Sequence, residues 1–363
     1  MALACGIVGL PNVGKSTLFN AITHAQAPAS NYPFCTLEAN VGVVAVPDER
    51  LAALAGIFRS KKIVPSTTTF VDIAGLVRGA SQGEGLGNQF LSHIREVDAV
   101  AMVVRCFESP DVTHVEGDAD PLRDVDIVNL ELALADMAVV DRRLEKTRPR
   151  ARADAKLGAE LLCLETMRAA LDRGTPVRSL IADPAIHSLA QELTLLTAKP
   201  MLFVANVDER PSEATTQRVA AVRERALADG AECIAVCAQI EAELAALPPE
   251  EATAMALELG VERSALDEFV VAAYRSLKLM TFLTAGEKET RAWTIERGTK
   301  APEAAGKIHT DIERGFIRAE IASFDDLERL QSVQAVKDAG LLRVEGRDYV
   351  MQEGDVVTFR FNV

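Results

Sequence analysis

The chain of 363 residues has no apolar run long enough to span a membrane. Its start, Met1 followed directly by an apolar segment, lacks both the basic region and the cleavage site of a secretion signal. Six cysteines are scattered without the spacing of a metal site or a disulfide framework, which suits a reducing compartment. These absences predict a cytoplasmic protein with no membrane partner.

The sequence also lacks an excess of positive charge, because 39 Lys and Arg residues face 53 Asp and Glu residues, giving −14. A protein that coats nucleic acid over its whole surface would carry the opposite sign. Any contact with nucleic acid must therefore come from a local basic patch. The length allows two or three domains, and 48 % hydrophobic residues are ordinary for a globular protein.

What the sequence does contain is a phosphate-binding P-loop. The segment 9–17, GLPNVGKST, follows an apolar stretch at 4–8 and leads into a helical one. Strand, glycine loop and helix is the context that this motif requires. Lys15 can reach the β- and γ-phosphates, and the Ser16 hydroxyl can bind Mg²⁺. The candidate nucleotide-binding residues of the loop are Asn12, Val13, Gly14, Lys15, Ser16 and Thr17.

Two later segments predict the rest of the Mg²⁺ and γ-phosphate site. Thr36, in the loop before the β-rich stretch 41–46, is a candidate metal ligand, although the threonines at 67–69 compete for the role. An apolar strand ends in Asp72-x-x-Gly75. Asp72 would hold the metal through a water molecule, and the Gly75 N–H would face the phosphate. The glycine-rich segment 75–87 is typical of a nucleotide-dependent switch.

The glutamine that orients the attacking water in many GTPases is absent, because residue 76 is a leucine. Hydrolysis is then slow, or another group positions the water. His114, in the polar loop 108–117, is one candidate, since histidine suits general base or water-orienting work. A monovalent cation near Asn12 is another.

From about residue 127, leucines recur at helical spacing and predict a helical hairpin inserted into the nucleotide domain. Seven cations and two acids fall at its expected tip, a local charge of +5 that favours contact with a phosphate backbone. A solvated helix end is the alternative. The cations are Arg142, Arg143, Lys146, Arg148, Arg150, Arg152 and Lys156.

The strand ending in Asn206-Val207-Asp208-Glu209 lies where base-recognition residues belong. The usual guanine-specific pattern is Asn-Lys-x-Asp, but here Val207 replaces the lysine and Glu209 the aspartate. Guanine offers two adjacent donors to a carboxylate, whereas adenine presents an acceptor at N1. The changed motif therefore favours ATP. A later strand, 232–239, would bring the backbone of Cys237 and Ala238 to the base.

The remaining residues predict a small α+β module. The expected organisation is a nucleotide-binding domain of residues 1–126 and 199–277, a helical insertion of 127–198 and a C-terminal domain of 278–363. The C-terminal domain carries several basic residues that could contact RNA, although an ordinary surface without a binding role explains them equally well. They are Arg291, Arg297, Lys300, Lys307, His309, Arg314 and Arg318.

Together these motifs resemble the YchF (Obg-like ATPase) family over nearly the whole chain. The matching segments are 9–17, NYPFCT at 31–36, DIAGLVRGA at 72–80, GEGLGNQFL at 83–91, RCF at 105–107, NVDE at 206–209, TAGEKETRAW at 284–293 and IHTD at 308–311.

The resemblance implies an α/β fold with a Ras-like P-loop domain, an inserted α-helical coiled-coil domain and a C-terminal α+β TGS domain. It implies hydrolysis of ATP in preference to GTP, and binding to ribosomes or their subunits. The family has a hydrophobic residue at the position of Leu76, and a histidine matching His114 is thought to help hydrolysis. Related potassium-activated GTPases use an asparagine matching Asn12, which implies a K⁺ site.

The sequence thus predicts a cytoplasmic, Mg²⁺-dependent, slow ATPase that acts on ribosomes as a nucleotide-dependent switch in translation or stress responses. One alternative is an Obg-type GTPase switch. Another, of a different class, is an RNA- or ribosome-binding adaptor in which the nucleotide only stabilises the shape.

Overall fold

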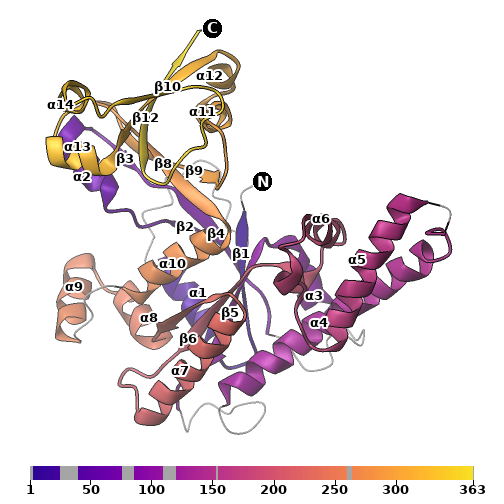
Figure 1. Ribbon diagram of the computed structural model, residues 1–363. Coiled ribbons are helices and arrows are strands. Elements are labelled where there is room, and N and C mark those ends of the chain that lie inside the picture. Colours follow the sequence, from indigo (N-terminus) through magenta and orange to yellow (C-terminus); the bar gives the residue numbers. More distant parts are fainter. Residues whose placement is uncertain are drawn as a thin grey trace. The chain divides into compact units, whose positions relative to one another are not determined.

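The computed structural model describes residues 3–24, 40–75, 86–108, 120–152, 154–259 and 264–362. The chain divides into two compact units, one of Met1–Val43 with Thr69–Ala273 and one of Val44–Thr68 with Tyr274–Val363. Among the described residues, no helix combines the length and the apolar character needed to cross a membrane. Figure 1 labels the elements along the chain.

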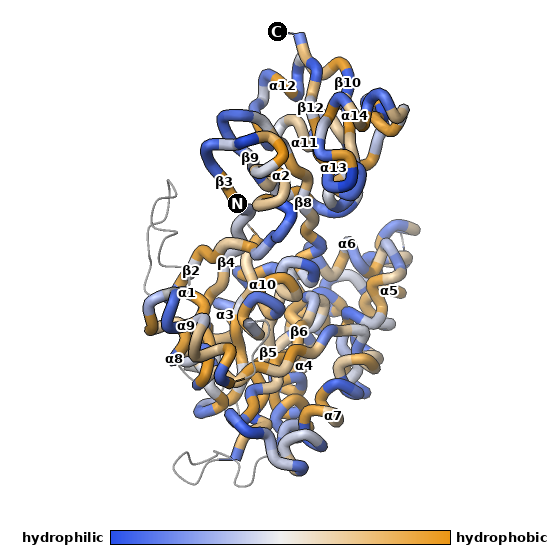
Figure 2. Tube along the Cα trace, turned by 90° about the vertical axis from the view of Figure 1, so that its left-hand side faces the viewer, coloured by the Kyte–Doolittle hydropathy of each residue, from blue (hydrophilic) through white to orange (hydrophobic). Residues whose placement is uncertain are grey.

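The first sheet has the strand order β2-β4-β1-β5-β6-β7 within the described residues. Strands β4, β1, β5, β6 and β7 run parallel to one another. Every residue of β5 and β6 is buried, as expected for strands covered on both faces, and both are largely apolar in Figure 2. The strands are β1 (Ala4–Val8), β2 (Val41–Ala45), β4 (Thr67–Asp72), β5 (Ala99–Arg105), β6 (Met201–Asn206) and β7 (Glu232–Val236).

The helices of the first unit include both short connecting helices and one long pair. The short helices are α1 (Lys15–His24), α3 (Leu86–Glu96), α6 (Pro184–Glu192), α7 (Glu213–Ala228), α8 (Ala238–Ala246), α9 (Pro249–Glu258) and α10 (Ala265–Ser276), with 3₁₀ turns η3 (Val177–Leu180) and η4 (Leu196–Ala198). On α10, which ends in the second unit, Phe269 stacks on Phe70 of β4 with the ring centroids 5.2 Å apart.

The long pair, α4 (Pro121–Thr147) and α5 (Ala155–Asp172), lies side by side (Figure 1). Helix α4 begins at Pro121, with Asp120 accepting a hydrogen bond from the Arg123 N–H, rather than near 127 as the leucine spacing predicts. A core that includes Val140, Leu164 and Leu189 holds the pair together with α6.

The second sheet has the order β11-β10-β12-β8-β9-β3 within the described residues. Its strands are β3 (Ile63–Val64), β8 (Leu279–Ala285), β9 (Thr290–Glu296), β10 (Phe316–Ser323), β11 (Arg343–Glu345) and β12 (Asp355–Phe361). Its helices are α2 (Arg50–Phe58), α11 (Ala301–Ile308), α12 (Thr310–Arg314), α13 (Phe324–Leu330) and α14 (Val333–Asp338).

Both faces of this second sheet are buried. Phe282 and Ile321 pack on α11 on one face. On the other face, Leu283 joins a cluster with Leu54 of α2 and Leu327 of α13. Helix α2 and strand β3 therefore belong to the second unit, although the sequence assigns residues 44–68 to the nucleotide domain. The second unit continues from Tyr274 to Val363.

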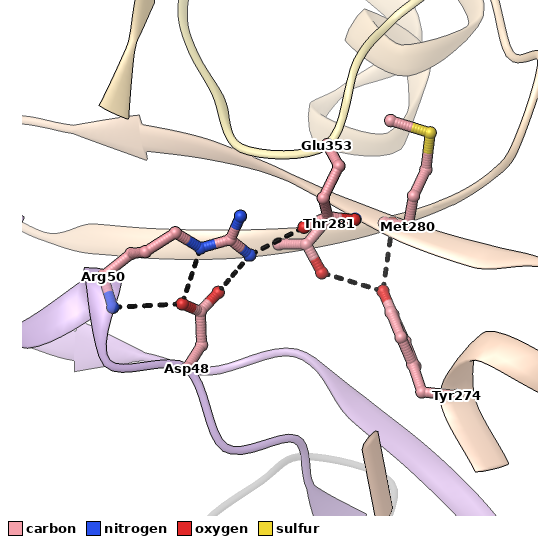
Figure 3. A network of polar contacts seen from close by, with 6 residues as sticks. All are labelled: Asp48, Arg50, Tyr274, Met280, Thr281 and Glu353. Atoms are coloured by element: carbon pink, nitrogen blue, oxygen red, sulfur yellow. Dashed lines mark hydrogen bonds and ion pairs between the residues drawn. The ribbon is translucent and has the colours of Figure 1, made fainter. Parts of the chain in front are cut away.

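Hydrogen bonds also tie the segment 44–68 into the second unit (Figure 3). Arg50 donates from Nε to Asp48 at 2.7 Å and from Nη2 to Glu353 at 2.7 Å. The other oxygen of Glu353 accepts from the Thr281 N–H at 3.0 Å, and Tyr274 bonds to Thr281 and to the Met280 carbonyl. Segments more than two hundred positions apart in the sequence thus share one polar network.

Candidate nucleotide-binding site

The candidate site lies where the parallel strands of the first sheet end. The chain leaves β1 with β4 on one side and β5 on the other, so the strand order reverses there. In open α/β sheets, ligands bind outside the carboxyl ends of the strands at such a point. The P-loop follows β1, Asp72 ends β4, Asn206 ends β6 and Cys237 follows β7. The fold therefore collects motifs that are far apart in sequence.

The P-loop backbone takes conformations that favour glycine. Gly9 and Gly14 have φ angles of 153° and 96°, and Asn12 is left-handed at 64°. A Cβ atom at Gly9 would lie 2.5 Å from the Val103 carbonyl oxygen, and one at Gly14 would overlap the Asn206 amide. The loop thus passes close to β5 and β6, and α1 starts at Lys15 with its N–H groups at the loop.

Lys15 is buried, and its Nζ donates a hydrogen bond of 2.7 Å to the Leu10 carbonyl. Burial lowers the pKa of Lys15 to about 8, and the charge of Asp72 offsets part of this effect. A Cβ atom at Gly75 would stand 3.0 Å from Nζ, so the backbone of Gly75 passes close to the lysine ammonium group. A phosphate group at this position would stabilise the charged form of Lys15.

Ser16 and Asp72 offer a set of oxygen atoms that fits Mg²⁺. The Ser16 hydroxyl donates to Oδ2 of Asp72 at 3.0 Å. Burial raises the pKa of Asp72, against the effects of Ser16 and Lys15. Within the described residues, Oδ1 of Asp72 is buried and has no hydrogen-bond partner. A buried carboxylate oxygen without a donor, beside a hydroxyl, suits a hard cation that keeps several waters.

A cavity of about 730 Å³ lies beside the P-loop. Of the predicted nucleotide-binding residues, Asn12, Gly14, Thr17, Asn206, Val207, Glu209, Cys237 and Ala238 line it. Val13 is buried, and Lys15, Ser16 and Gly75 form the contacts described above. Thr36 and His114 lie outside the residues that the structure describes.

Asn206 connects three parts of the cavity wall. Its amide donates from Nδ2 to the Val13 carbonyl at 2.9 Å, and its Oδ1 accepts from the Ala238 N–H at 3.1 Å. Its own carbonyl accepts from the N–H groups of Cys106 and Phe107. The side chain thus fixes the P-loop and the start of α8 relative to β6. Because the amide is buried and its hydrogen bonds are satisfied, it holds these segments rigidly.

The sequence does not predict four residues of the wall, namely Phe107, Glu108, Arg210 and Gln239. Asp208, the second acid of the base-recognition segment, also lines it. Phe107 and Glu108 follow β5, and the position directly after a buried parallel strand is the signal that could have found them. The Arg105 guanidinium lies 4.5 Å from the centre of the Phe107 ring, and Arg218 pairs with Glu108 at 2.9 Å. These contacts hold the wall beside the cavity.

The basic segment 142–156 lies where α4 leads into α5. Arg143 pairs with Glu160 at 2.6 Å and Glu192 at 3.1 Å, and Arg148 pairs with Glu165. Acids on α5 and α6 therefore neutralise part of the predicted charge. The other five cations are exposed: Arg142, Lys146, Arg150, Arg152 and Lys156.

Two family models match the chain. Residues 4–140 match a family described as "50S ribosome-binding GTPase". Residues 279–362 match the YchF-GTPase C-terminal family, described as "Protein of unknown function (DUF933)". The two matches fall on the P-loop segment and on the second sheet, respectively.

Full-length relatives are also found. The "Ribosome-binding ATPase YchF" of Bacillus subtilis (strain 168) is 50 % identical over 366 residues and covers 100 % of both chains. The protein of the same name from Escherichia coli O157:H7 is 48 % identical over 364 residues, with 100 % of both covered.

Two solved structures share the fold. The YchF GTPase of Schizosaccharomyces pombe has a TM-score of 0.86 at 37 % identity, covering 99 % of this chain and 97 % of that chain. A GTP-binding protein from Pyrococcus horikoshii OT3 has a TM-score of 0.60 at 20 % identity, covering 99 % and 100 %, a likeness of fold alone. The chain therefore has the α/β fold of P-loop GTPases together with a C-terminal domain.

Proposed function

Because this chain belongs to the YchF family, we propose that it is a Mg²⁺-dependent P-loop ATPase that binds the ribosome or its subunits as a nucleotide-dependent switch. Its relatives carry the name ribosome-binding ATPase at about half identity over their full length. The observation that carries the proposal is the convergence of the P-loop, Asp72 and Asn206 at the carboxyl ends of one sheet. The proposed activity is slow and takes place in the cytoplasm.

The proposed preference for ATP over GTP depends on the base end of the cavity. Val207 offers no cation, and Glu209 is one methylene longer than the aspartate of guanine-specific sites. Asp208 does not replace that aspartate, because both its carboxylate oxygens accept hydrogen bonds within the protein. Adenine, which presents an acceptor at N1, fits a wall without a close, free carboxylate better than guanine does.

At the phosphate end, Lys15 and the N–H groups of the P-loop bind the β- and γ-phosphates, with Gly75 at the γ-phosphate. Ser16, Thr36 and Asp72 hold Mg²⁺, which neutralises phosphate charge when bound. Leu76 cannot orient water, and His114 takes that role in the proposal. A K⁺ ion near Asn12 is part of the same proposal.

The proposed domain organisation assigns residues 127–198 to an inserted coiled-coil domain and 278–363 to a TGS domain. The antiparallel pair α4 and α5 and the second sheet support it. The ribosome, or ribosomal RNA, would be met through the exposed cations of Arg142–Lys156 and through the TGS domain. The segment 44–68 adds α2 and β3 to the unit that contains the proposed TGS domain.

The test is the dissociation constant of the purified protein for ATP and GTP with Mg²⁺ and K⁺ present. Tighter ATP binding by at least about tenfold is expected, a difference of about 1.4 kcal/mol. If GTP binds more tightly, the base-recognition argument fails and the chain is an Obg-type GTPase switch. That second candidate is favoured by the names of the matching family and of the S. pombe protein, both of which say GTPase.

A ribosome co-sedimentation assay separates the switch from an adaptor with a structural nucleotide. Ribosome binding that depends on ATP, and loses this dependence in Lys15→Ala, supports the switch. Equal binding with and without nucleotide supports the adaptor.

A further inference from the structure

Asp208 is the residue of the base-recognition segment whose carboxylate is fully engaged. Its Oδ1 accepts a hydrogen bond of 3.0 Å from the Glu108 N–H. Its Oδ2 accepts one of 2.7 Å from the Thr215 hydroxyl. Asp208 also lines the cavity, so the two bonds hold a charged group that is already at the wall. The direction of this carboxylate is set by its two donors.

The other acids of the wall differ from Asp208. Glu108 pairs with Arg218 at 2.9 Å. Glu209 is exposed and, within the described residues, has no hydrogen bond or ion pair. The wall thus carries one paired acid, one acid held by hydrogen bonds and one acid that is free to move. Which of these acids contacts the base depends on whether the hydrogen bonds to Asp208 keep its carboxylate in place.

Thr215 is well placed to keep the Asp208 carboxylate in position. The residue is fully buried in the first turn of α7. Ser212 caps this helix, accepting from the Thr215 N–H at 3.1 Å and lying 3.2 Å from its hydroxyl. The positive N-terminal end of α7 also favours the negative charge of Asp208. The hydroxyl is therefore oriented by the helix start and has little freedom to turn away.

We propose that Thr215 is a specificity-determining positioning residue, which keeps the Asp208 carboxylate away from the base. The proposal rests on the proposed nucleotide binding. A carboxylate released from Thr215 could accept the N1–H and 2-amino donors of guanine, and would be repelled by the N1 lone pair of adenine. Losing the hydroxyl therefore favours GTP at the expense of ATP, although Thr215 touches neither nucleotide.

The experiment measures dissociation constants for ATP and GTP in Thr215→Val, which keeps the shape and removes the donor. The ratio of GTP to ATP dissociation constants is expected to fall by about tenfold, near the lower end of the range for one hydrogen bond to a charged group. Thr215→Ser keeps a hydroxyl and should keep the ratio of the unmodified protein. Thr215→Val combined with Asp208→Asn should restore the ratio, because the released group is then uncharged.

Two outcomes would overturn the proposal. If Thr215→Val weakens the binding of ATP and GTP equally, Thr215 only supports the structure of the cavity wall. If binding of both is unchanged, Asp208 stays in place without the hydrogen bond from Thr215. If Thr215→Val does not fold, as judged by its thermal transition, Thr215→Ala gives the same comparison. Failure of the unmodified protein to bind either nucleotide would instead overturn the proposed function itself.

Discussion

The Asp136 carboxylate and Thr197 are joined by two hydrogen bonds, from the Thr197 N–H at 2.8 Å and from its hydroxyl at 2.7 Å. The second oxygen of Asp136 accepts from the Leu196 N–H at 2.8 Å. Asp136 is fully buried on α4, and Thr197 belongs to the turn directly before β6. One acid thus connects the long helix to the strand that ends in Asn206.

Replacing Asp136 by alanine leaves three buried donors without a partner. The free energy of unfolding is expected to fall by about 2–5 kcal/mol, since each orphaned donor costs about 1–3 kcal/mol and neighbours relax in part. Urea denaturation measures the change. Glu145→Ala, at an exposed site on the same helix, is the matched control and should change stability by less than about 0.5 kcal/mol. Similar stabilities for the two variants would contradict the assigned role.

Asn206→Asp tests the amide that joins the P-loop to α8. The new carboxylate can still accept from the Ala238 N–H, but it faces the Val13 carbonyl, where the amide donates now. Repulsion at the P-loop should weaken ATP binding by about tenfold or more. Isothermal titration measures it. Glu224→Gln, exposed on α7, is the control and should bind as the unmodified protein does. Undiminished affinity in Asn206→Asp would show that the bond to Val13 does not matter.

The lowered pKa of Lys15 predicts a pH dependence of nucleotide binding. Below pH 8 the lysine is already charged, whereas above it the free protein must take up a proton to bind phosphate. ATP affinity should therefore fall as pH rises above about 8, by at most about tenfold per pH unit. Binding titrations at increasing pH measure this fall. Lys15→Arg stays charged, so its affinity, although lower, should not show the same decline. Identical pH profiles would exclude Lys15 as the titrating group.

The local motifs could be predicted from the sequence because each combines a fixed spacing with its own strand and helix. The P-loop, Asp72 and Asn206 are of this kind, and the parallel sheet then brings them together. The anchoring of Asp208 by Thr215 could not be predicted, because it depends on where α7 begins relative to β5. The predicted roles of Thr36 and His114 stay predictions.

The membership of α2 and β3 in the second unit could not be predicted either. Strand β3 has only two residues, and it pairs with β9 across more than two hundred positions of sequence. Nothing in the spacing of residues 44–68 indicates so distant a partner. Their apolar pattern fits the nucleotide domain equally well, and only the tertiary structure separates the two choices.

Leu54→Ala tests this membership. Leu54 is fully buried in a cluster with Leu283 and Val356 of the C-terminal segment. The substitution should destabilise the second unit by about 2–4 kcal/mol. Hydrogen exchange should speed up in β8 and β12, while ATP affinity should stay the same, because the cavity is lined by the first unit. Faster exchange in β1 and β5 instead would assign Leu54 to the first unit.

The interrupted second unit has a consequence for the order in which the protein is made. Ile63 and Val64 leave the ribosome about 230 residues before Thr290 and Arg291, the strand residues with which they pair. At usual rates of synthesis this is a wait of roughly 10 to 50 s. During that time the apolar side chains of α2 lack Leu283, Leu327 and Val356, with which they cluster in the finished protein. A nascent chain stalled before residue 279 should therefore be a better client for chaperones than the finished protein is.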